Sequence, residues 1–146
     1  MRKICLLGGT GFVGKHLSNR LIKMGWQVRV LTRRSEQYPE LRLVPNLELV
    51  STKIYEQEQL NMHLAGCEAV VNLIGILNES GNKGTGFRKT HVELPQKVVA
   101  ACQQNQIKRL LHLSALNADA KQGTSHYLRT KGEAEEFVRT VADLQV

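Results

Sequence analysis

The amino-acid sequence predicts an α/β fold built on a doubly wound parallel sheet, and three observations predict it. Strand-like and helix-like segments alternate along most of the chain. Most strand-like runs are apolar on both faces, which is typical of strands that helices cover on either side of a sheet. A glycine-rich turn, GGTGFVG, joins the first apolar run to the first helical pattern. Together these features favour the Rossmann arrangement, in which ligands bind where the strand order reverses.

The first half of the chain is predicted to hold three strands and two helices. Lys3–Leu7 is a short apolar run and is predicted to be a buried strand. Residues 12–24 carry apolar side chains at helical spacing, and Gly25 ends this helix. The other elements of this half are a strand rich in β-branched residues at Gln27–Thr32, a strand at Leu47–Ser51 and a short helix at residues 56–64.

The second half continues the alternation. Two further strands are predicted at residues 69–74 and 109–113, with a helix at residues 90–105 between them. The segment from Gly75 to Gly86 places four glycines among polar residues, and we expect a mobile loop there. A last helix with a charged outer face is predicted at residues 127–141, and VADLQV stands where a sixth strand would begin.

The composition is that of a soluble globular domain. The chain has 146 residues, of which 42% are hydrophobic and 23% charged, enough for one domain with a real core. No apolar run approaches the roughly 20 residues that cross a bilayer. Only Met1 and Arg2 precede the first strand, so we expect no signal or transit peptide and a cytoplasmic location. The three cysteines lack metal-ligand spacing, which predicts reduced thiols, a buried Cys5 and no metal site.

The formal net charge is +7 at neutral pH, which raises the question of an acidic partner. A basic protein can bind nucleic acid, an anionic membrane surface or a phosphorylated small molecule. Here the lysines and arginines are spread along the chain, and aromatic residues make up only 5% of it. This pattern predicts solvated helix faces for most of the positive charges and disfavours nucleic-acid binding.

The glycine turn predicts a dinucleotide site. Glycine loses side-chain packing and costs backbone entropy, so a cluster of glycines needs a reason. Gly8, Gly11 and Gly14 match Gly-x-x-Gly-x-x-Gly between a strand and a helix, whose amino end suits a pyrophosphate. The first glycine would permit the tight turn, and the second would let phosphate oxygens approach the backbone. The third would let helix and strand pack closely.

The end of the second strand predicts which dinucleotide is preferred. An acidic residue about 20 positions beyond the glycine turn would bind the ribose 2′-hydroxyl of NAD. This chain has Arg33 and Arg34 there, and the next carboxylate is Glu36. A guanidinium suits a 2′-phosphate, so NADP(H) is predicted as the preferred cofactor and NAD(H) is the alternative. A further alternative is that one or both arginines point into solvent.

A second pattern, Tyr127-x-x-x-Lys131, lies in the predicted last helix, where residues four apart are neighbours. A tyrosine is a poor base at neutral pH, but an adjacent ammonium stabilises the phenolate. The pair could then move a proton while a hydride goes to or from a nicotinamide. The spacing is common by chance and gains meaning only behind a fifth strand and a glycine turn.

Together these patterns resemble the short-chain dehydrogenases/reductases, over nearly the whole chain. The glycine turn is similar to that of their extended and atypical branches, although the commoner form has Thr where this chain has Leu7. The segments VVNLIG, FRKTHVELPQKVVAAC and RLLHLSALNADA look most like the nucleotide-binding accessory subunit of respiratory complex I and its bacterial relatives. The resemblance implies an NAD(P)-binding, epimerase/dehydratase-like protein that holds NADPH tightly without an established turnover.

The resemblance assigns roles to single residues. Tyr127 would be the acid/base, Lys131 would hold the nicotinamide ribose, and Ser114 is the nearest match to the substrate-orienting hydroxyl. The serine of the family often lies one or two places later, so Ser114 could instead be a strand-end residue only. Arg33 would meet the adenosine ribose phosphate. The residues assigned to the cofactor are Gly8, Thr10, Gly11, Phe12, Val13, Gly14, Arg33, Arg34, Leu73, Gly75 and Lys131.

Two departures from the family affect the prediction. The aspartate that commonly follows the third strand and contacts adenine is replaced by Ser51-Thr52. Family members also continue well beyond this length, through further strands and a small substrate-binding region. We therefore interpret residues 1–146 as an NAD(P)-binding Rossmann domain that forms the N-terminal part of a longer chain. Much of the substrate pocket would then lie outside these residues. A protein of minimal natural length is the alternative.

Two classes of function remain open. One is an NADP(H)-dependent oxidoreductase or epimerase-type enzyme acting on an unknown small molecule, and the other is a non-catalytic module in which the dinucleotide is structural or senses redox state. A homodimer or a larger complex is compatible with either. The five histidines lack paired spacing and are predicted to take surface or strand-end roles. His91 is the exception, because the family often has a polar residue there near the active-site tyrosine.

Overall fold

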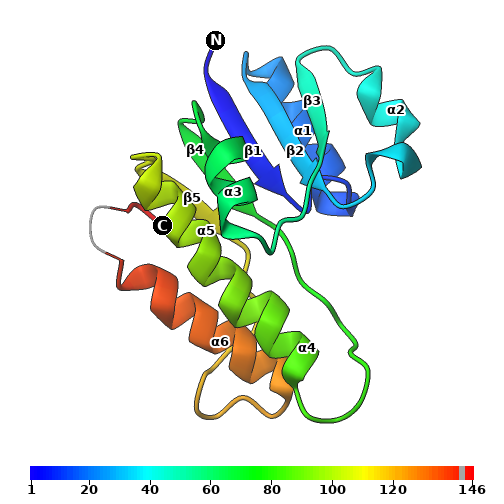
Figure 1. The fold of residues 1–146 in the computed structure, drawn as a ribbon. Helices are drawn as coiled ribbons and strands as arrows, with labels where there is room; N and C mark the ends of the chain where they lie inside the picture. Colours follow the sequence, from blue (N-terminus) through cyan, green and yellow to red (C-terminus); the bar gives the residue numbers. More distant parts are fainter. Residues whose placement is uncertain (142–143) are drawn as a thin grey trace.

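The computed structural model describes residues 1–141 and 144–146 and contains a five-stranded parallel sheet, as predicted (Figure 1). The strand order is β3-β2-β1-β4-β5, and each neighbouring pair is parallel. The order reverses between β1 and β4, which makes the carboxyl ends of these strands the switch point of a doubly wound fold. The strands are β1 (Lys3–Leu7), β2 (Gln27–Thr32), β3 (Leu47–Ser51), β4 (Ala69–Asn72) and β5 (Arg109–His112).

Helices cover both faces of the sheet. In Figure 1, α3 (Gln57–Leu64), α5 (Leu94–Gln104) and α6 (His126–Arg139) lie in front of it, and α1 (Phe12–Lys23) lies behind. Successive side chains of β1 point to opposite faces of the sheet. Cys5 and Leu7 belong to the buried cluster on one face, and Ile4 and Leu6 belong to the cluster on the other. Burial on both faces explains why this strand is a continuous apolar run in the sequence.

The predicted elements are present, and β1, β2 and β3 have the predicted boundaries, whereas the boundaries of later elements differ. β4 ends at Asn72 instead of residue 74, because the Asn72 Oδ1 accepts a hydrogen bond from the Ile74 N–H at 3.1 Å and turns the chain. The predicted loop is shorter, since α4 (Thr85–Arg88) begins within it and continues through a π-helical turn (Lys89–Glu93) into α5. β5 ends one residue early, at His112, and α6 ends at Arg139.

The end of the chain adds to the sheet beside β5. The predicted sixth strand begins within VADLQV, of which residues 142 and 143 lie outside the described residues. Beyond them, Gln145 forms a parallel bridge with Arg109, and the Gln145 carbonyl accepts a hydrogen bond from the Leu110 N–H at 2.9 Å. The sixth position is thus on the outer side of β5.

Two short helical segments between β2 and β3 were not predicted. A 3-10 turn (Ser35–Gln37) is followed by α2 (Pro39–Arg42), whose first residue is a proline, as helix starts favour. The Arg42 guanidinium donates to the Ser35 Oγ at 2.9 Å and ties the two segments together. Segments of three and four residues are too short to show helical periodicity in a sequence.

The cysteines are free thiols, and all three are buried, which confirms the expectation for Cys5. Over residues 1–141 and 144–146, no group of three or more His, Cys, Asp or Glu side chains is arranged to hold a metal ion.

Among the helices of the described residues, none combines the length and the apolar character that crossing a bilayer requires.

Two neighbours in β5 test the placement of this strand. Leu110 is 1% exposed and Leu111 is 48% exposed. Leu110→Ala should lower the free energy of unfolding by about 2–5 kcal/mol, because it leaves a cavity in the core. Leu111→Ala is the matched control and should cost under about 1 kcal/mol. Urea unfolding followed by circular dichroism measures both, and equal losses would contradict the opposite orientation of the two side chains.

Candidate functional site

The glycine turn after β1 brings the start of α1 against the backbone of the turn itself. Gly8 adopts φ +80°, a left-handed conformation, and its carbonyl accepts a hydrogen bond from the Gly11 N–H at 3.2 Å. A Cβ on Gly14 would lie 2.4 Å from the Gly9 Cα, so a side chain there would push the helix away. A Cβ on Gly11 would lie 3.5 Å from the Gly8 carbonyl oxygen, which is ordinary contact. The backbone beside Gly11 is therefore approachable.

Gly9 was not assigned a role from the sequence, and its role lies in packing. A Cβ at this position would stand 2.7 Å from a methyl carbon of Val30 in β2. The turn thus needs bare backbone on two sides, against α1 and against the neighbouring strand. The Gly-x-x-Gly-x-x-Gly pattern does not include Gly9, so it does not indicate the packing against β2.

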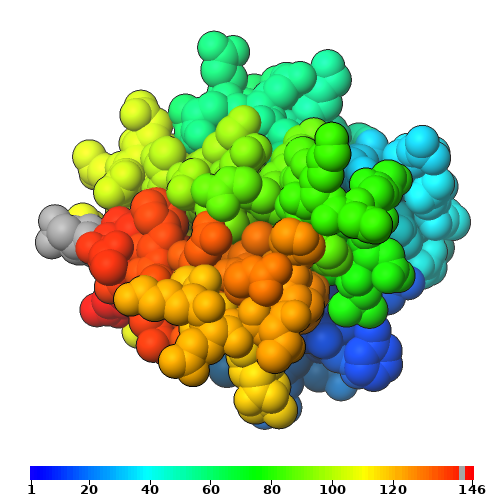
Figure 2. Space-filling model, turned by 90° about the horizontal axis from the view of Figure 1, so that it is seen from below, coloured from blue at the N-terminus to red at the C-terminus, as the bar shows by residue number. Residues whose placement is uncertain are grey.

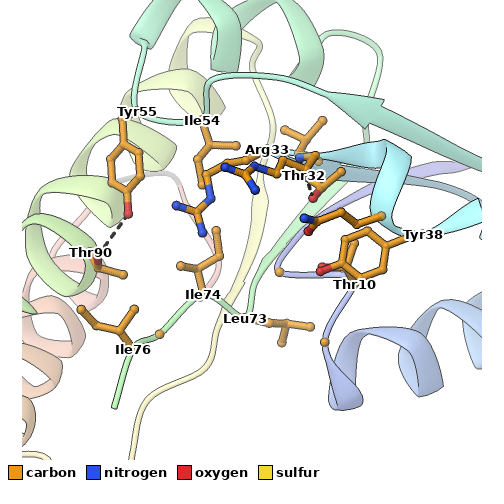
Figure 3. A pocket seen from close by; sticks show the side chains of 16 residues that line it. Thr10, Thr32, Arg33, Tyr38, Ile54, Tyr55, Leu73, Ile74, Ile76 and Thr90 are labelled. Atoms are coloured by element: carbon orange, nitrogen blue, oxygen red, sulfur yellow. Dashed lines mark hydrogen bonds between the residues drawn. The ribbon is translucent and has the colours of Figure 1, made fainter. Parts of the chain in front are cut away.

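A groove of about 730 Å³ runs across the carboxyl ends of the strands (Figure 3). It extends from the turn after β1 to the segments that follow β2, β3 and β4. The predicted cofactor residues that line it are Gly8, Thr10, Gly11, Arg33, Arg34, Leu73 and Gly75. Phe12, Val13 and Gly14 begin α1 and are outside this lining, as is Lys131. Phe12 is 81% exposed.

Arg33 and Arg34 stand at the β2 side of the groove, as the sequence predicts. Both are exposed, and neither forms an ion pair within the part of the chain that the structure describes. Their backbone is fixed from β3, because the Ser51 Oγ donates to the Arg33 carbonyl at 3.2 Å and accepts from the Ser35 N–H at 3.3 Å. Ser51 therefore holds the arginine segment in place.

A second cavity of about 490 Å³ continues the groove over the end of β3. Arg33, Ile54 and Tyr55 line both spaces. Tyr55 also closes the groove on its far side, since its hydroxyl is 3.1 Å from the Thr90 Oγ1 (Figure 3). Tyr55 and Thr90 were not predicted as site residues, because this contact joins segments 35 residues apart.

Tyr127 and Lys131 are one turn apart on α6, as predicted, but they differ in environment. Tyr127 is half-buried and lines a third cavity of about 540 Å³ with Phe87 and His126. Lys131 is 4% exposed, and its Nζ donates to the Leu113 carbonyl at 2.6 Å. Burial lowers the pKa of the Lys131 ammonium.

Lys131 reaches the groove from beneath. A Cβ on Gly75 would lie 3.9 Å from the Lys131 Nζ, so the ammonium stands directly behind a groove residue. Ser114, at the end of β5, has its hydroxyl oxygen buried and, among the described residues, without a hydrogen-bond partner. Lys131 thus lies behind the groove, and Tyr127 lines a separate cavity.

His91 links the segment after β4 to α6, and its contacts were not evident from the sequence. Its side chain is 1% exposed, so it differs from the surface role predicted for the other histidines. The Nε2 accepts a hydrogen bond from the Ile76 N–H at 3.0 Å, which leaves the Nδ1 to donate to the Thr130 Oγ1 at 3.0 Å. The ring meets Tyr127 edge-on with a centroid distance of 5.3 Å, near the tyrosine as expected.

The imidazole of His91 is neutral at physiological pH. Burial, and then the positive charge of Lys131, lower the pKa of His91 to about 4. The same causes lower the pKa of His112, at the end of β5, to about 4. His91 lies in the π-helical turn, a local form that is frequent at functional sites but has no clear sequence signal.

The segment after β4 is anchored at its far end by Glu79. Its carboxylate accepts hydrogen bonds from the N–H groups of Gly84, Gly86 and Phe87 at 2.6–3.1 Å. Burial alone would raise the pKa of the Glu79 carboxyl, but these donors outweigh it and lower the pKa. Figure 2 shows the green surface of this segment directly against the orange surface of α6, where a Cβ on Gly84 would lie 2.7 Å from the His126 ring.

A parallel sheet with a glycine turn and a groove at its switch point defines a Rossmann dinucleotide-binding protein. The bare turn at Gly8 and the open backbone beside Gly11 fit a pyrophosphate. The chain belongs to the NAD(P)H-binding family, whose family model matches residues 8–145.

Curated proteins similar to the chain include a mitochondrial NADH dehydrogenase subunit and a ketoreductase. Mitochondrial NADH dehydrogenase (ubiquinone) 1 alpha subcomplex subunit 9 of Mus musculus is 30% identical over 141 residues, which are 93% of this chain and 36% of the relative. The 4-hydroxy-2-methyl-3-oxo-4-farnesyl-3,4-dihydroquinoline-1-oxide ketoreductase of Stigmatella aurantiaca is 25% identical over 146 residues, 90% of this chain and 43% of the relative. The chain thus spans less than half of the length of these relatives.

UDP-glucuronic acid 4-epimerase from Bacillus cereus, in complex with NAD, has the same fold. It superimposes with a TM-score of 0.79 at 19% identity, over 94% of this chain and 51% of that one. These comparisons confirm the resemblance to short-chain dehydrogenases/reductases and to the complex I accessory subunit.

The lowered pKa values of His91 and His112 predict how stability depends on pH. Their pKa of about 4 lies below the ordinary value of 6.5, so between these values the unfolded chain binds more protons than the folded chain. Stability should be full above about pH 6.5 and fall as the pH decreases towards 4. Urea midpoints measured across this range should show the fall. His91→Gln should reduce the slope of stability against pH by the equivalent of up to one proton taken up on unfolding. An unchanged slope in this variant would contradict a neutral His91 imidazole in the folded chain.

Proposed function

We propose that this chain binds NADP(H) in preference to NAD(H). The observation that carries the proposal is the pair Arg33 and Arg34, exposed at the groove where a carboxylate would otherwise meet the ribose 2′-hydroxyl. Guanidinium groups form charge-assisted, bidentate hydrogen bonds with phosphate oxygens. Glu40, whose carboxylate pairs with the Lys15 ammonium at 2.9 Å, does not line the groove.

The other predicted residues take places along an extended dinucleotide. The turn from Gly8 to Gly14, with Thr10 and the first backbone N–H groups of Phe12 and Val13, would hold the pyrophosphate at the start of α1. Leu73 and Gly75 would lie beside the nicotinamide half. Lys131 would reach its ribose from behind Gly75, 3.9 Å from a Cβ placed there.

Titration calorimetry with NADPH and NADH tests the preference. NADPH should bind more tightly, and Arg34→Ala or Arg33→Ala should weaken NADPH binding by about 10- to 100-fold, the value of one charge-assisted hydrogen bond. NADH affinity should change little, because it has no 2′-phosphate. Lys23→Ala, on the exposed end of α1, is the matched control for lost charge. Tighter binding of NADH by the unaltered chain would refute the proposal.

We further propose an NADP(H)-dependent oxidoreductase or epimerase-type enzyme in which Tyr127 exchanges a proton with the substrate. A bound nicotinamide would supply or accept the hydride. Tyr127 lines an open cavity, and the buried Lys131 one turn away would favour its phenolate. The Ser114 hydroxyl would orient the substrate or serve only at the strand end. The ketoreductase and epimerase names of the relatives support this class.

A second candidate is a non-catalytic dinucleotide-binding module in a larger assembly. Two observations favour it. The Lys131 Nζ is engaged with the Leu113 carbonyl at 2.6 Å, which suits a structural lysine. The similar mouse protein is named as a subunit of NADH dehydrogenase. In this case the cofactor would stabilise the fold or report the redox state.

Tyr127→Phe separates the two candidates. NADPH oxidation is followed with a panel of ketones and sugar nucleotides, and cofactor binding is measured in parallel. If the protein is an enzyme of this class, loss of the Tyr127 hydroxyl should abolish turnover. NADPH affinity should stay unchanged, since the ring and its packing remain. Thr140→Val, at the exposed end of α6, is the control for loss of a hydroxyl away from the groove and the Tyr127 cavity. Absence of turnover from the unaltered protein would favour the module, whereas turnover that survives Tyr127→Phe would show an enzyme that does not use Tyr127 as its proton donor.

A further inference from the structure

We propose that Ser51 is a positioning residue that sets the preference for NADPH over NADH, because its hydroxyl fixes the backbone that carries Arg33 and Arg34. The inference rests on the NADP(H) binding proposed above and deepens it. Ser51 is outside the lining of the main groove, so its effect on the cofactor would pass through the two arginines. The observation that carries the inference is a hydroxyl with one hydrogen bond to each end of the arginine segment, residues 33–35.

The arginine segment lies between two regular elements and is not held by strand pairing. β2 ends at Thr32 and the 3-10 turn starts at Ser35, so the pairing of β2 with β3 stops before Arg33. Both arginine side chains are exposed, and in residues 1–141 and 144–146 no carboxylate pairs with them. The positions of the two guanidinium groups therefore depend on how firmly their backbone is held.

Ser51 holds this backbone from the neighbouring strand. Its Oγ donates to the Arg33 carbonyl at 3.2 Å and accepts from the Ser35 N–H at 3.3 Å. A hydroxyl has one proton and two acceptor lone pairs, so a single side chain can make both bonds. Ser51 is the last residue of β3 and is paired in register with Thr32, the last residue of β2. The arginine segment is thus tied to the sheet at the point where it leaves the sheet.

The other contacts of the arginine segment do not replace the Ser51 hydroxyl. The Arg34 N–H is 3.4 Å from the Thr32 Oγ1, which is long for a hydrogen bond. The Arg42 guanidinium donates to the Ser35 Oγ at 2.9 Å, so it holds a side chain and not the backbone of the arginines. Loss of the Ser51 hydroxyl would therefore free both ends of the segment at once.

A loosened arginine segment would weaken NADPH binding and leave NADH binding unchanged. Charge-assisted, bidentate bonds to a phosphate require the guanidinium in a fixed orientation. A segment that is loose in the free protein has to be ordered on binding, and this ordering costs affinity. NADH has no 2′-phosphate and would make no use of the segment, so its binding would not carry this cost.

Titration calorimetry with NADPH and NADH, on the unaltered chain and on Ser51→Ala, tests the inference. Ser51→Ala should weaken NADPH binding by about 3- to 10-fold, the net effect of one ordinary hydrogen bond, and should leave NADH affinity unchanged. Ser51→Thr keeps the hydroxyl on a β-branched side chain that suits a strand, and should keep the preference. Ser80→Ala, exposed in the segment after β4 and outside the groove lining, is the matched control.

A second arm tests whether Ser51 acts through the arginines. The variant Arg33→Ala/Arg34→Ala lacks both guanidinium groups. Adding Ser51→Ala to it should cause no further loss of NADPH affinity, whereas the effects of independent residues would add. Circular dichroism of each variant checks that the fold is kept.

Several results overturn the inference while the unaltered chain still prefers NADPH. They are an unchanged ratio of the two affinities in Ser51→Ala, an equal loss of both affinities, and a further loss in the absence of both arginines. Loss of the preference in Ser51→Thr overturns it because the hydroxyl is then not the cause, and loss of the fold in Ser51→Ala would mark a purely structural residue. An unaltered chain that binds NADH as tightly as NADPH would instead refute the proposed function and the inference with it.

Discussion

The contact between the first turn of α1 and the turn that precedes it is the constraint on which the site depends. Gly14 packs where any side chain would collide with the backbone of Gly8 and Gly9. This contact sets the amino end of α1 at the carboxyl end of β1, beside the switch point of the sheet. The unpaired N–H groups of a helix start and the groove are therefore in the same place, which is the physical requirement for holding a pyrophosphate.

Much of the fold follows from local patterns in the sequence. β1, β2 and β3 have the predicted boundaries, because each is an apolar or β-branched run between turn residues. β4 does not, since the Asn72 side chain accepts a hydrogen bond from the Ile74 N–H and ends the strand early, and apolar character alone cannot show that. The short helical segments after β2 were missed because they are stabilised by single contacts, such as the one from Arg42 to Ser35.

The site, like the fold, has features that the sequence shows and features that it does not. Patterns within one segment, such as the glycine turn or the pair on α6, are visible in the sequence, and the structure places their residues near one another. Contacts between distant segments are not visible. His91 meets Ile76 and Thr130, and Tyr55 meets Thr90, only because the strand order brings their segments together. The sequence marked His91 only through the family resemblance, because a single imidazole in a helix carries no sign of what surrounds it.

The packing of Gly9 against Val30 has a consequence for how such chains diverge. With only 2.7 Å between a Cβ at position 9 and a methyl carbon of Val30, any side chain at position 9 needs a smaller residue at position 30. The reverse order of changes is harmless, because a smaller residue at position 30 leaves the glycine undisturbed. The two positions should therefore be substituted together across homologous sequences, and historically the strand residue should change before the turn residue.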